Sequence, residues 1–163
     1  MSVYDHISKF AVAIRDSASV RDYCVDEYER GAIVSIDDAG PDPLNSDDAP
    51  FIIVQKVPQA EIGTVADTHG WQIEIVCGVK TGEALSDIST ERTASANGLQ
   101  QFGNAKKAED LLALVLSVIR DLVLDEDAYI DDIADDSDGW SMLPLQTAAA
   151  SITVRRSRTM KEW

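Results

Sequence analysis

The sequence predicts an α+β fold in which one mostly antiparallel or mixed sheet of about four to five strands packs against two helices. Amphipathic patterns at residues 3–15 and 104–124 indicate the helices. Short β-branched or alternating segments between and after them indicate the strands. Because 163 residues is an ordinary size for one domain, we expect residues 1–163 to form a single domain.

The first helix is expected at residues 3–15. Its apolar residues form one stripe, so the other side of the helix should face water. Ser2 is a suitable N-cap, and Asp5 follows three residues later, as in a capping box with a shorter acidic side chain. The helix could continue towards Tyr23, because no glycine or proline interrupts the chain before Gly31.

Two strands are expected next, separated by a loop. Residues 32–36, A-I-V-S-I, are short and β-branched, which is typical of a strand. Residues 51–57 begin directly after Pro50, and proline is allowed at the start of a strand. The four apolar residues that open this segment indicate a strand covered on both faces.

A further strand is expected at residues 71–79, where side chains alternate between a buried and a wetter face. The buried face would carry Trp71, Ile73, Ile75 and Cys77, and the wetter face Gln72, Glu74 and Val76. Gly78 indicates either a bulge or the close approach of another group.

Polar segments separate these elements. We expect long loops at residues 37–50, 80–103 and 125–140, because these stretches offer few core-forming residues. Residues 40–49 and 131–139 should be mobile, since their many acidic side chains repel one another.

The core should be organised around the helix at residues 104–124. Its main apolar stripe contains Ile119 and Leu122, which we expect in the core. Leu114 and Leu116 widen the stripe beyond what one sheet face requires. Such a helix needs two neighbours, which could be the sheet and a second helix or another subunit.

The chain ends in a predicted strand, whose alternation is clearest at residues 148–155, and a basic tail at residues 155–163. Arg155, Arg156 and Arg158 in this tail belong to the only basic cluster in the chain. Such charges either keep an edge strand from aggregating or bind an acidic surface of a neighbour.

Acidic residues dominate the charge. The chain has 14 Lys and Arg residues against 29 Asp and Glu, a formal net charge of −15. This charge repels nucleic acids and anionic membranes, so neither is expected as the main partner. The acidity either keeps the protein soluble through self-repulsion, matches a basic partner or lines a lumen.

No motif for catalysis, cofactor binding or metal binding stands out, and we expect no enzyme activity. The acidic run before Gly139 fails as an EF-hand, because Ala134 and Leu145 occupy the positions of two anchor ligands. A solvated acidic loop is favoured over a weak divalent-cation site. His6 and His69 lack a familiar catalytic partner in sequence and should have structural or surface roles.

Cys24 and Cys77 are the only cysteines and form no CxxC pair, so we expect two buried thiols in a reducing compartment. The N-terminal residues lack the basic and apolar regions of a signal peptide, and no apolar window approaches the length of a transmembrane helix. A soluble, cytoplasmic protein is therefore expected.

The order of elements resembles the tail terminator, or tail completion, proteins of long-tailed bacteriophages and prophages. The resemblance lies in the short N-terminal helix, the strands P-F-I-I-V and Q-I-E-I-V, the long amphipathic helix and the closing strand S-I-T-V-R-R. It covers most of the chain in layout, although residues 80–103 and 125–138 are long for the family. Other phage neck and head–tail connector proteins are similar to a lesser degree.

This resemblance implies a small α+β structural protein that forms a hexameric ring on the finished tail tube, stops tube growth and presents a surface for head joining. The implied partners are other copies of the chain, the tail tube protein and a head-side connector protein. The implied location is the tail or neck of the virion, after assembly in the host cytoplasm.

In a ring, the subunit interface would join two different patches. Leu114 and Leu116 would supply apolar contacts, and Arg155, Arg156 and Arg158 would face the acidic loop of the neighbouring copy. The alternative function is an acidic binding module for a basic protein partner, which the net charge of −15 favours.

Overall fold

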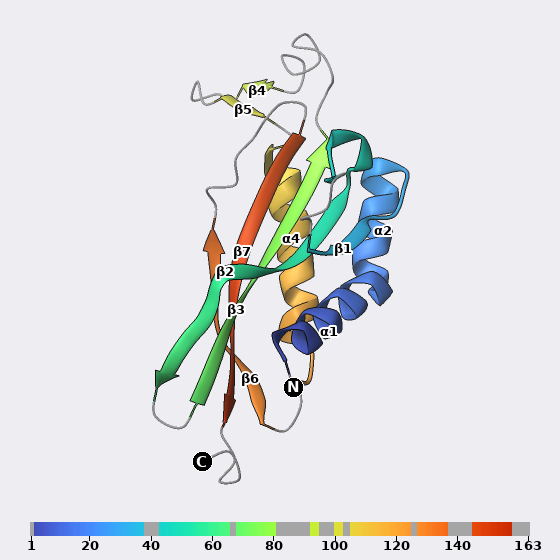
Figure 1. Cartoon of the computed structure of the whole chain (residues 1–163). Coiled ribbons are helices and arrows are strands. Elements are labelled where there is room, and N and C mark those ends of the chain that lie inside the picture. The colour runs from blue at the N-terminus through green and yellow to red at the C-terminus, as the bar shows by residue number, and fades with distance from the viewer. Residues whose placement is uncertain are drawn as a thin grey trace.

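The computed structural model describes residues 2–37, 43–65, 68–80, 92–94, 100–102, 105–124, 127–136 and 145–157 (Figure 1). The helices are α1 (Val3–Asp16), α2 (Ala18–Tyr28), the short 3-10 helix η1 (Ser46–Asp48) and α4 (Ala105–Arg120). The strands are β1 (Ile33–Ile36), β2 (Phe51–Val65), β3 (Thr68–Lys80), β4 (Arg92–Ala94), β5 (Gln100–Phe102), β6 (Ala128–Asp136) and β7 (Leu145–Ser157).

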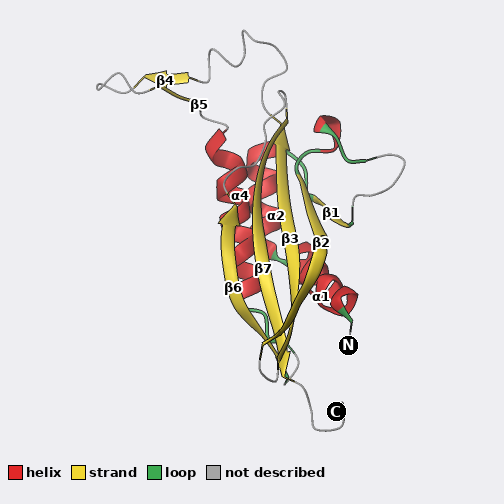
Figure 2. Ribbon diagram, turned by 60° about the vertical axis from the view of Figure 1, so that its left-hand side comes forward, coloured by secondary structure: helices red, strands yellow, loops and turns green. Residues whose placement is uncertain are grey.

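One sheet and one helix layer make up the fold, with α1, α2 and α4 all on the same face of the sheet (Figure 2). The five strands have the order β1-β2-β3-β7-β6, and β4 and β5 form a separate two-stranded ribbon. β1 runs parallel to β2, and the other neighbours in the large sheet are antiparallel. The predicted α+β class and mixed sheet are confirmed, with three α-helices in place of two.

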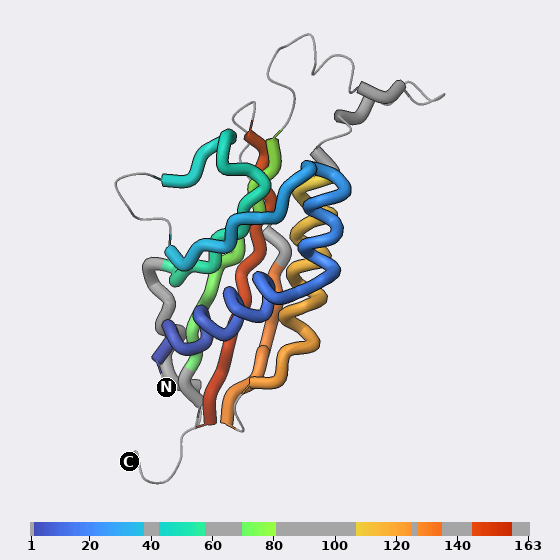
Figure 3. The backbone as a smooth tube through the Cα atoms, turned by 90° about the vertical axis from the view of Figure 1, so that its right-hand side faces the viewer, coloured from blue at the N-terminus to red at the C-terminus, as the bar shows by residue number. Residues whose placement is uncertain are grey.

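The extra helix arises at Ser17, where the first helix was expected to continue. The Ser17 backbone is extended, with φ −70° and ψ 119°, and its side chain accepts a hydrogen bond from the Val20 N–H at 3.4 Å. Serine is a favoured N-cap because its hydroxyl satisfies a free N–H of the new helix. The chain therefore changes direction without glycine or proline, so that α1 crosses the sheet and α2 lies beside α4 (Figure 3).

The core lies between the helix layer and the inner face of the sheet. α4 packs on β3 and β7 and also contacts α1 and α2, so its wide apolar stripe is covered by neighbours from the same chain. Ile119 is fully buried there, as predicted, whereas Leu122 is only half-buried beyond the end of the helix. The strands contribute buried side chains at alternating positions: Ile52, Val54, Ile73, Ile75, Cys77, Val79, Ala148, Ala150, Ile152 and Val154.

Gly78 marks a close approach on the opposite, outer face of the sheet, one of the two alternatives that the sequence left open. It pairs across β2 and β3 with Phe51, and a Cβ placed on Gly78 would lie 2.3 Å from Cζ of the Phe51 ring. Phe51 is buried there with Ala49, Ile53 and Leu145. The ring thus occupies the space that any larger residue at position 78 would need.

The acidic segment after α4 is a strand, which contradicts the predicted loop at residues 125–140. β6 pairs with β7 along the edge of the sheet, and Ile130 and Ile133 pack against the core. The register shifts between Ile130 and Asp132, which is the signature of a bulge. Because the two isoleucines are three residues apart, the segment lacks the two-residue period by which a strand is recognised.

The other predicted loops also contain regular structure. η1 lies within residues 37–50, and β4 and β5 lie within residues 80–103. Residues 131–136 belong to the β6–β7 ladder, which contradicts the expected mobile loop there, whereas residues 137–139 lie outside the described part. The predicted basic tail begins inside β7, which continues to Ser157.

Candidate functional site

An open apolar groove lies on the helix layer, between the outer side of α1 and the residues that follow α4. Its volume is about 600 Å³. The lining residues are Asp5, Ser8, Lys9, Val12 and Ala13 from α1, with Leu122 and Val123. Val12 is 45% exposed and Val123 is 87% exposed, so the apolar character of the groove is presented directly to solvent.

The position of α1 explains why Val12 stays outside. The inner stripe of α1 is fully used in the core, where it buries Val3, His6, Ile7, Phe10, Ala11 and Ile14. Rotating the helix to bury Val12 would expose part of this stripe. The exposed valine is therefore a consequence of the fold and not of loose packing.

The groove is electrostatically unlike the rest of the chain. Its charged residues are Asp5 and Lys9, one of each sign and one helical turn apart. The Ser2 backbone N–H donates to the Asp5 carboxylate, which confirms the predicted capping box and lowers the pKa of Asp5. The groove thus has no net charge in a chain whose formal net charge is −15.

The apolar residues that the sequence assigned to a subunit interface lie elsewhere. Leu116 is 5% exposed and belongs to the core, because α1 and α2 cover the side of α4 that the sequence left open to another subunit. It therefore offers no surface to a second copy. Leu114 is half-buried and packs against the same core.

The basic end and the acidic segment meet within one chain. Nε of Arg155 lies 2.7 Å from Oδ2 of Asp131, because β6 pairs directly with β7. Arg156 follows on β7, and Arg158 lies outside the described residues. An intermolecular role for Arg155 would have to compete with this intramolecular ion pair.

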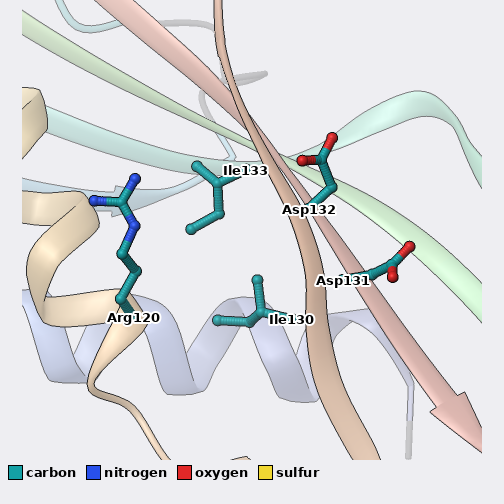
Figure 4. A pocket seen from close by; sticks show the side chains of 5 residues that line it. All are labelled: Arg120, Ile130, Asp131, Asp132 and Ile133. Atoms are coloured by element: carbon teal, nitrogen blue, oxygen red, sulfur yellow. The ribbon is translucent and has the colours of Figure 1, made fainter.

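A second hollow, of about 420 Å³, lies between the end of α4 and β6 (Figure 4). Arg120, Ile130 and Ile133 lie on one side of the strand, whereas Asp131 and Asp132 point away from it on the other side. The guanidinium and the carboxylates therefore do not converge on one point. This hollow lacks the clustered polar groups of a typical small-molecule site.

The histidine and the two cysteines whose side chains the structure describes are buried. His6 is fully buried, with its ring centroid 5.3 Å from that of Trp71. Burial raises the pKa of Cys24 to about 11 and also raises that of Cys77. A neutral thiol is a poor nucleophile at neutral pH. These placements confirm the expected structural histidine and buried thiols, while the side chain of His69 lies outside the described part.

Metal binding and membrane crossing would each require a specific feature among the described residues. Among them, no group of three or more His, Cys, Asp or Glu side chains is arranged to hold a metal ion. None of the helices in this part of the chain has the length and apolar character needed to cross a membrane.

The groove itself was not predicted. Val12 lies outside the apolar stripe of the first helix, and Val123 lies beyond the end of α4. An apolar residue off the stripe is the signal that could have pointed to it.

A scan of known protein families finds no model that matches this chain, and a search of curated proteins finds no significant match.

Proposed function

We propose that this chain is a non-catalytic structural subunit that assembles into a closed ring of the tail-terminator kind. In this role a hexameric ring would end a phage tail tube and join the tail to the head. Its partners would be further copies of itself, the tail tube protein and a head-side connector protein in the tail or neck of the virion. The observation that carries the proposal is the exposed apolar groove between α1 and the end of α4.

The layout of the fold supports the same proposal. α1, the long β2–β3 hairpin, the amphipathic α4 and the closing strand β7 follow in the order on which the resemblance to tail terminators rests. α1, α2 and α4 lie on one face of the sheet, and the side of α1 that carries the exposed Val12 faces solvent. An outer helix with apolar side chains is a suitable contact element for another subunit.

The size of the groove favours a ring over an isolated pair. Stable protein complexes usually bury about 800 Å² on each partner, and a few valine and leucine side chains supply only part of such an area. A single contact would therefore be weak. In a closed ring every subunit makes the contact twice, and the last contact forms at a high effective concentration.

The buried thiols and histidine support the absence of catalysis. Cys24 and Cys77 are inaccessible and protonated at neutral pH, and His6 is enclosed by the core. Some of the exposed ionisable groups form ion pairs between neighbours in sequence or space, such as Arg15 with Asp16 and Lys107 with Glu27. Such pairs are ordinary surface features.

The alternative is an acidic binding module for a basic protein partner. β6 supports this function, because Asp131 and Asp132 are exposed along an edge strand and Asp127 is exposed directly before it. An acidic edge can attract a basic partner over a long range at low salt. Another phage neck or connector protein would share the ring and differ only in its neighbours in the virion.

The experiment is a tube-capping assay with a tail tube protein encoded in the same genome as this chain. Tubes polymerised in the presence of the purified chain should stop at shorter lengths, and electron microscopy should show a ring at one tube end. Unchanged tube lengths and bare ends at micromolar chain would contradict the proposal. Tight binding to a basic protein instead would favour the acidic module.

A further inference from the structure

β1 is an edge strand that lacks the usual protection of an edge. It pairs with β2 on one side, and none of the described strands pairs with its other side. Its sequence, I-V-S-I, contains neither a charged residue nor a proline, which usually keep further strands from an edge. β6, at the opposite edge of the sheet, carries the exposed carboxylates of Asp131 and Asp132. β1 is therefore the edge that is open to strand addition.

The pairing with β2 determines which backbone groups of β1 face outward. The N–H groups of Ile33 and Asp37 each donate a 3.1 Å hydrogen bond to a carbonyl of the neighbouring segment 50–54. Because successive residues of a strand alternate in direction, the N–H and C=O groups of Val34 and Ile36 point away from β2. The outer side of β1 thus presents both donors and acceptors to a further strand.

A small pocket lies beside this edge on the helix face of the sheet, where α1, α2 and β1 meet (Figure 3). Its volume is about 160 Å³, below the roughly 300–1,000 Å³ of pockets that hold drug-sized ligands, so it fits a single side chain. Val34 lines it from β1, because the register with the buried Ile52 turns Val34 towards the helices. The other aliphatic side chains that line it are Ile14, Val20 and Ala32.

Among the described residues, the charged ones that line this pocket are both arginines, in a chain whose formal net charge is −15. Arg15 lies in the last turn of α1, and its Nε is 2.8 Å from Oδ1 of Asp16. Arg21 lies near the start of α2, and its Nε is 3.6 Å from Oδ1 of Asp22, beyond hydrogen-bond distance. Neither aspartate lines the pocket. Because such exposed pairs are weak, a carboxylate that enters the pocket can replace them.

We propose that β1 binds an extended acidic segment of a partner protein as an additional strand of the sheet. An aliphatic side chain of this segment occupies the pocket, and an acidic side chain two residues away, on the same face of the strand, reaches Arg15 or Arg21. Backbone hydrogen bonds to Val34 and Ile36 provide affinity, while the pocket and the arginines provide specificity. This contact goes beyond the ring function, because a free chain and a ring subunit can both make it.

The charge at the pocket decides the chemistry of the partner. A basic segment would place its cations beside Arg15 and Arg21, where like charges repel. An acidic segment is repelled by the net charge of the whole chain, but salt at physiological concentration screens exposed charges beyond about 8 Å. The arginines lie at contact distance from an added strand, so their attraction outweighs the screened repulsion of more distant acids.

The test titrates two synthetic peptides into the isotope-labelled chain and follows its backbone amides by nuclear magnetic resonance. The probe is acetyl-S-T-V-T-E-T-S-amide, which places valine and glutamate on one face of a strand, and the control peptide has lysine in place of glutamate. The probe should shift the amide signals of residues 31–37 and slow hydrogen exchange at Val34 and Ile36. The lysine peptide should bind about threefold or more weakly. Unshifted signals at millimolar probe, or equal binding of both peptides, would overturn the proposal.

Two variants separate the backbone contact from the charge contact. Ile36→Pro removes an outward N–H and keeps the hydrogen bonds to β2, so it should weaken binding of the probe about tenfold or more. Arg21→Glu reverses a charge at the pocket and should weaken binding about threefold or more and remove the preference for the acidic peptide. Arg120→Glu is the matched control, because Arg120 is exposed at the end of α4 and does not line this pocket.

Circular dichroism should show that the variants are folded, and Ile36→Asp, which repels the acidic probe at the same edge, replaces Ile36→Pro if the latter unfolds. Folded variants at positions 36 and 21 that bind the probe like the wild type would overturn the proposal. If raising the concentration of the chain alone shifts the signals of residues 31–37 in the same way, a second copy occupies the edge and the proposed partner is wrong.

Discussion

Replacing Gly78 by alanine tests the packing of the outer sheet face. The new methyl carbon would lie between 2.3 and 2.7 Å from three atoms of the Phe51 ring, well inside the carbon–carbon separation of about 3.5–4.0 Å at which contacts are favourable. Phe51 is buried with Ala49, Ile53 and Leu145, so its ring cannot move aside without losing those contacts.

Overpacking of this kind costs about 1–3 kcal/mol, and the reduced freedom of alanine in the unfolded chain returns about 0.4–1 kcal/mol. We therefore expect Gly78→Ala to lower the free energy of unfolding by about 1–2 kcal/mol. Urea unfolding followed by tryptophan fluorescence measures this change. Gly31→Ala is the matched control, because a Cβ there meets no atom within 4 Å.

A double-mutant cycle with Phe51→Leu identifies the cause. If the ring is the obstacle, Gly78→Ala should have little effect once leucine replaces Phe51, and the coupling energy should be about 1 kcal/mol or more. An equal loss in both backgrounds, or no loss in the wild type, would refute the reasoning.

Two further predictions concern the core. Ile119→Ala should lower the free energy of unfolding by about 2–5 kcal/mol, because Ile119 is fully buried on α4, and a loss below about 1 kcal/mol in urea would show that α4 is peripheral. Burial raises the pKa of Cys24 from its ordinary value of 9.0 to about 11 and also raises that of Cys77, so the folded state prefers the neutral thiols. Stability should therefore be complete below pH 9 and fall as the pH rises towards 11, since the unfolded thiols release their protons first; a Cys24→Ala variant with an unchanged alkaline slope would contradict this.

Local and periodic features of the fold could be predicted from the sequence. The burial of Ile119 follows from a helical repeat, and the Ser2–Asp5 cap follows from residues only three apart. Gly78 could be recognised because glycine inside an alternating strand usually marks a bulge or a close approach. These features can be predicted because each depends only on residues within one helix or strand.

Two other features of the fold, the start of α2 and the strand β6, were not predicted from the sequence. Ser17 starts a new helix because its hydroxyl caps Val20, and a serine within a helical pattern does not by itself show whether it will do so. The bulge between Ile130 and Asp132 hides the period of β6, so its acids suggested a loop. In both places the backbone departs from the repeat on which the prediction relied.

The candidate site could not be predicted, because it depends on how elements from distant parts of the chain cross. The sequence placed Leu116 at a subunit interface, but α1 and α2 cover α4 and Leu116 is buried. Val12 and Val123 are more than a hundred residues apart and become one surface where α1 passes the end of α4. No pattern within either segment contains that information.

The mass of the wild-type chain in solution is the most direct test of the proposed ring. Sedimentation equilibrium from micromolar to millimolar concentration, alone and with short tail tubes, should reveal a discrete closed species at six times the 17.7 kDa chain, with few intermediate sizes. A mass that stays at one chain throughout, with and without tubes, would contradict the account.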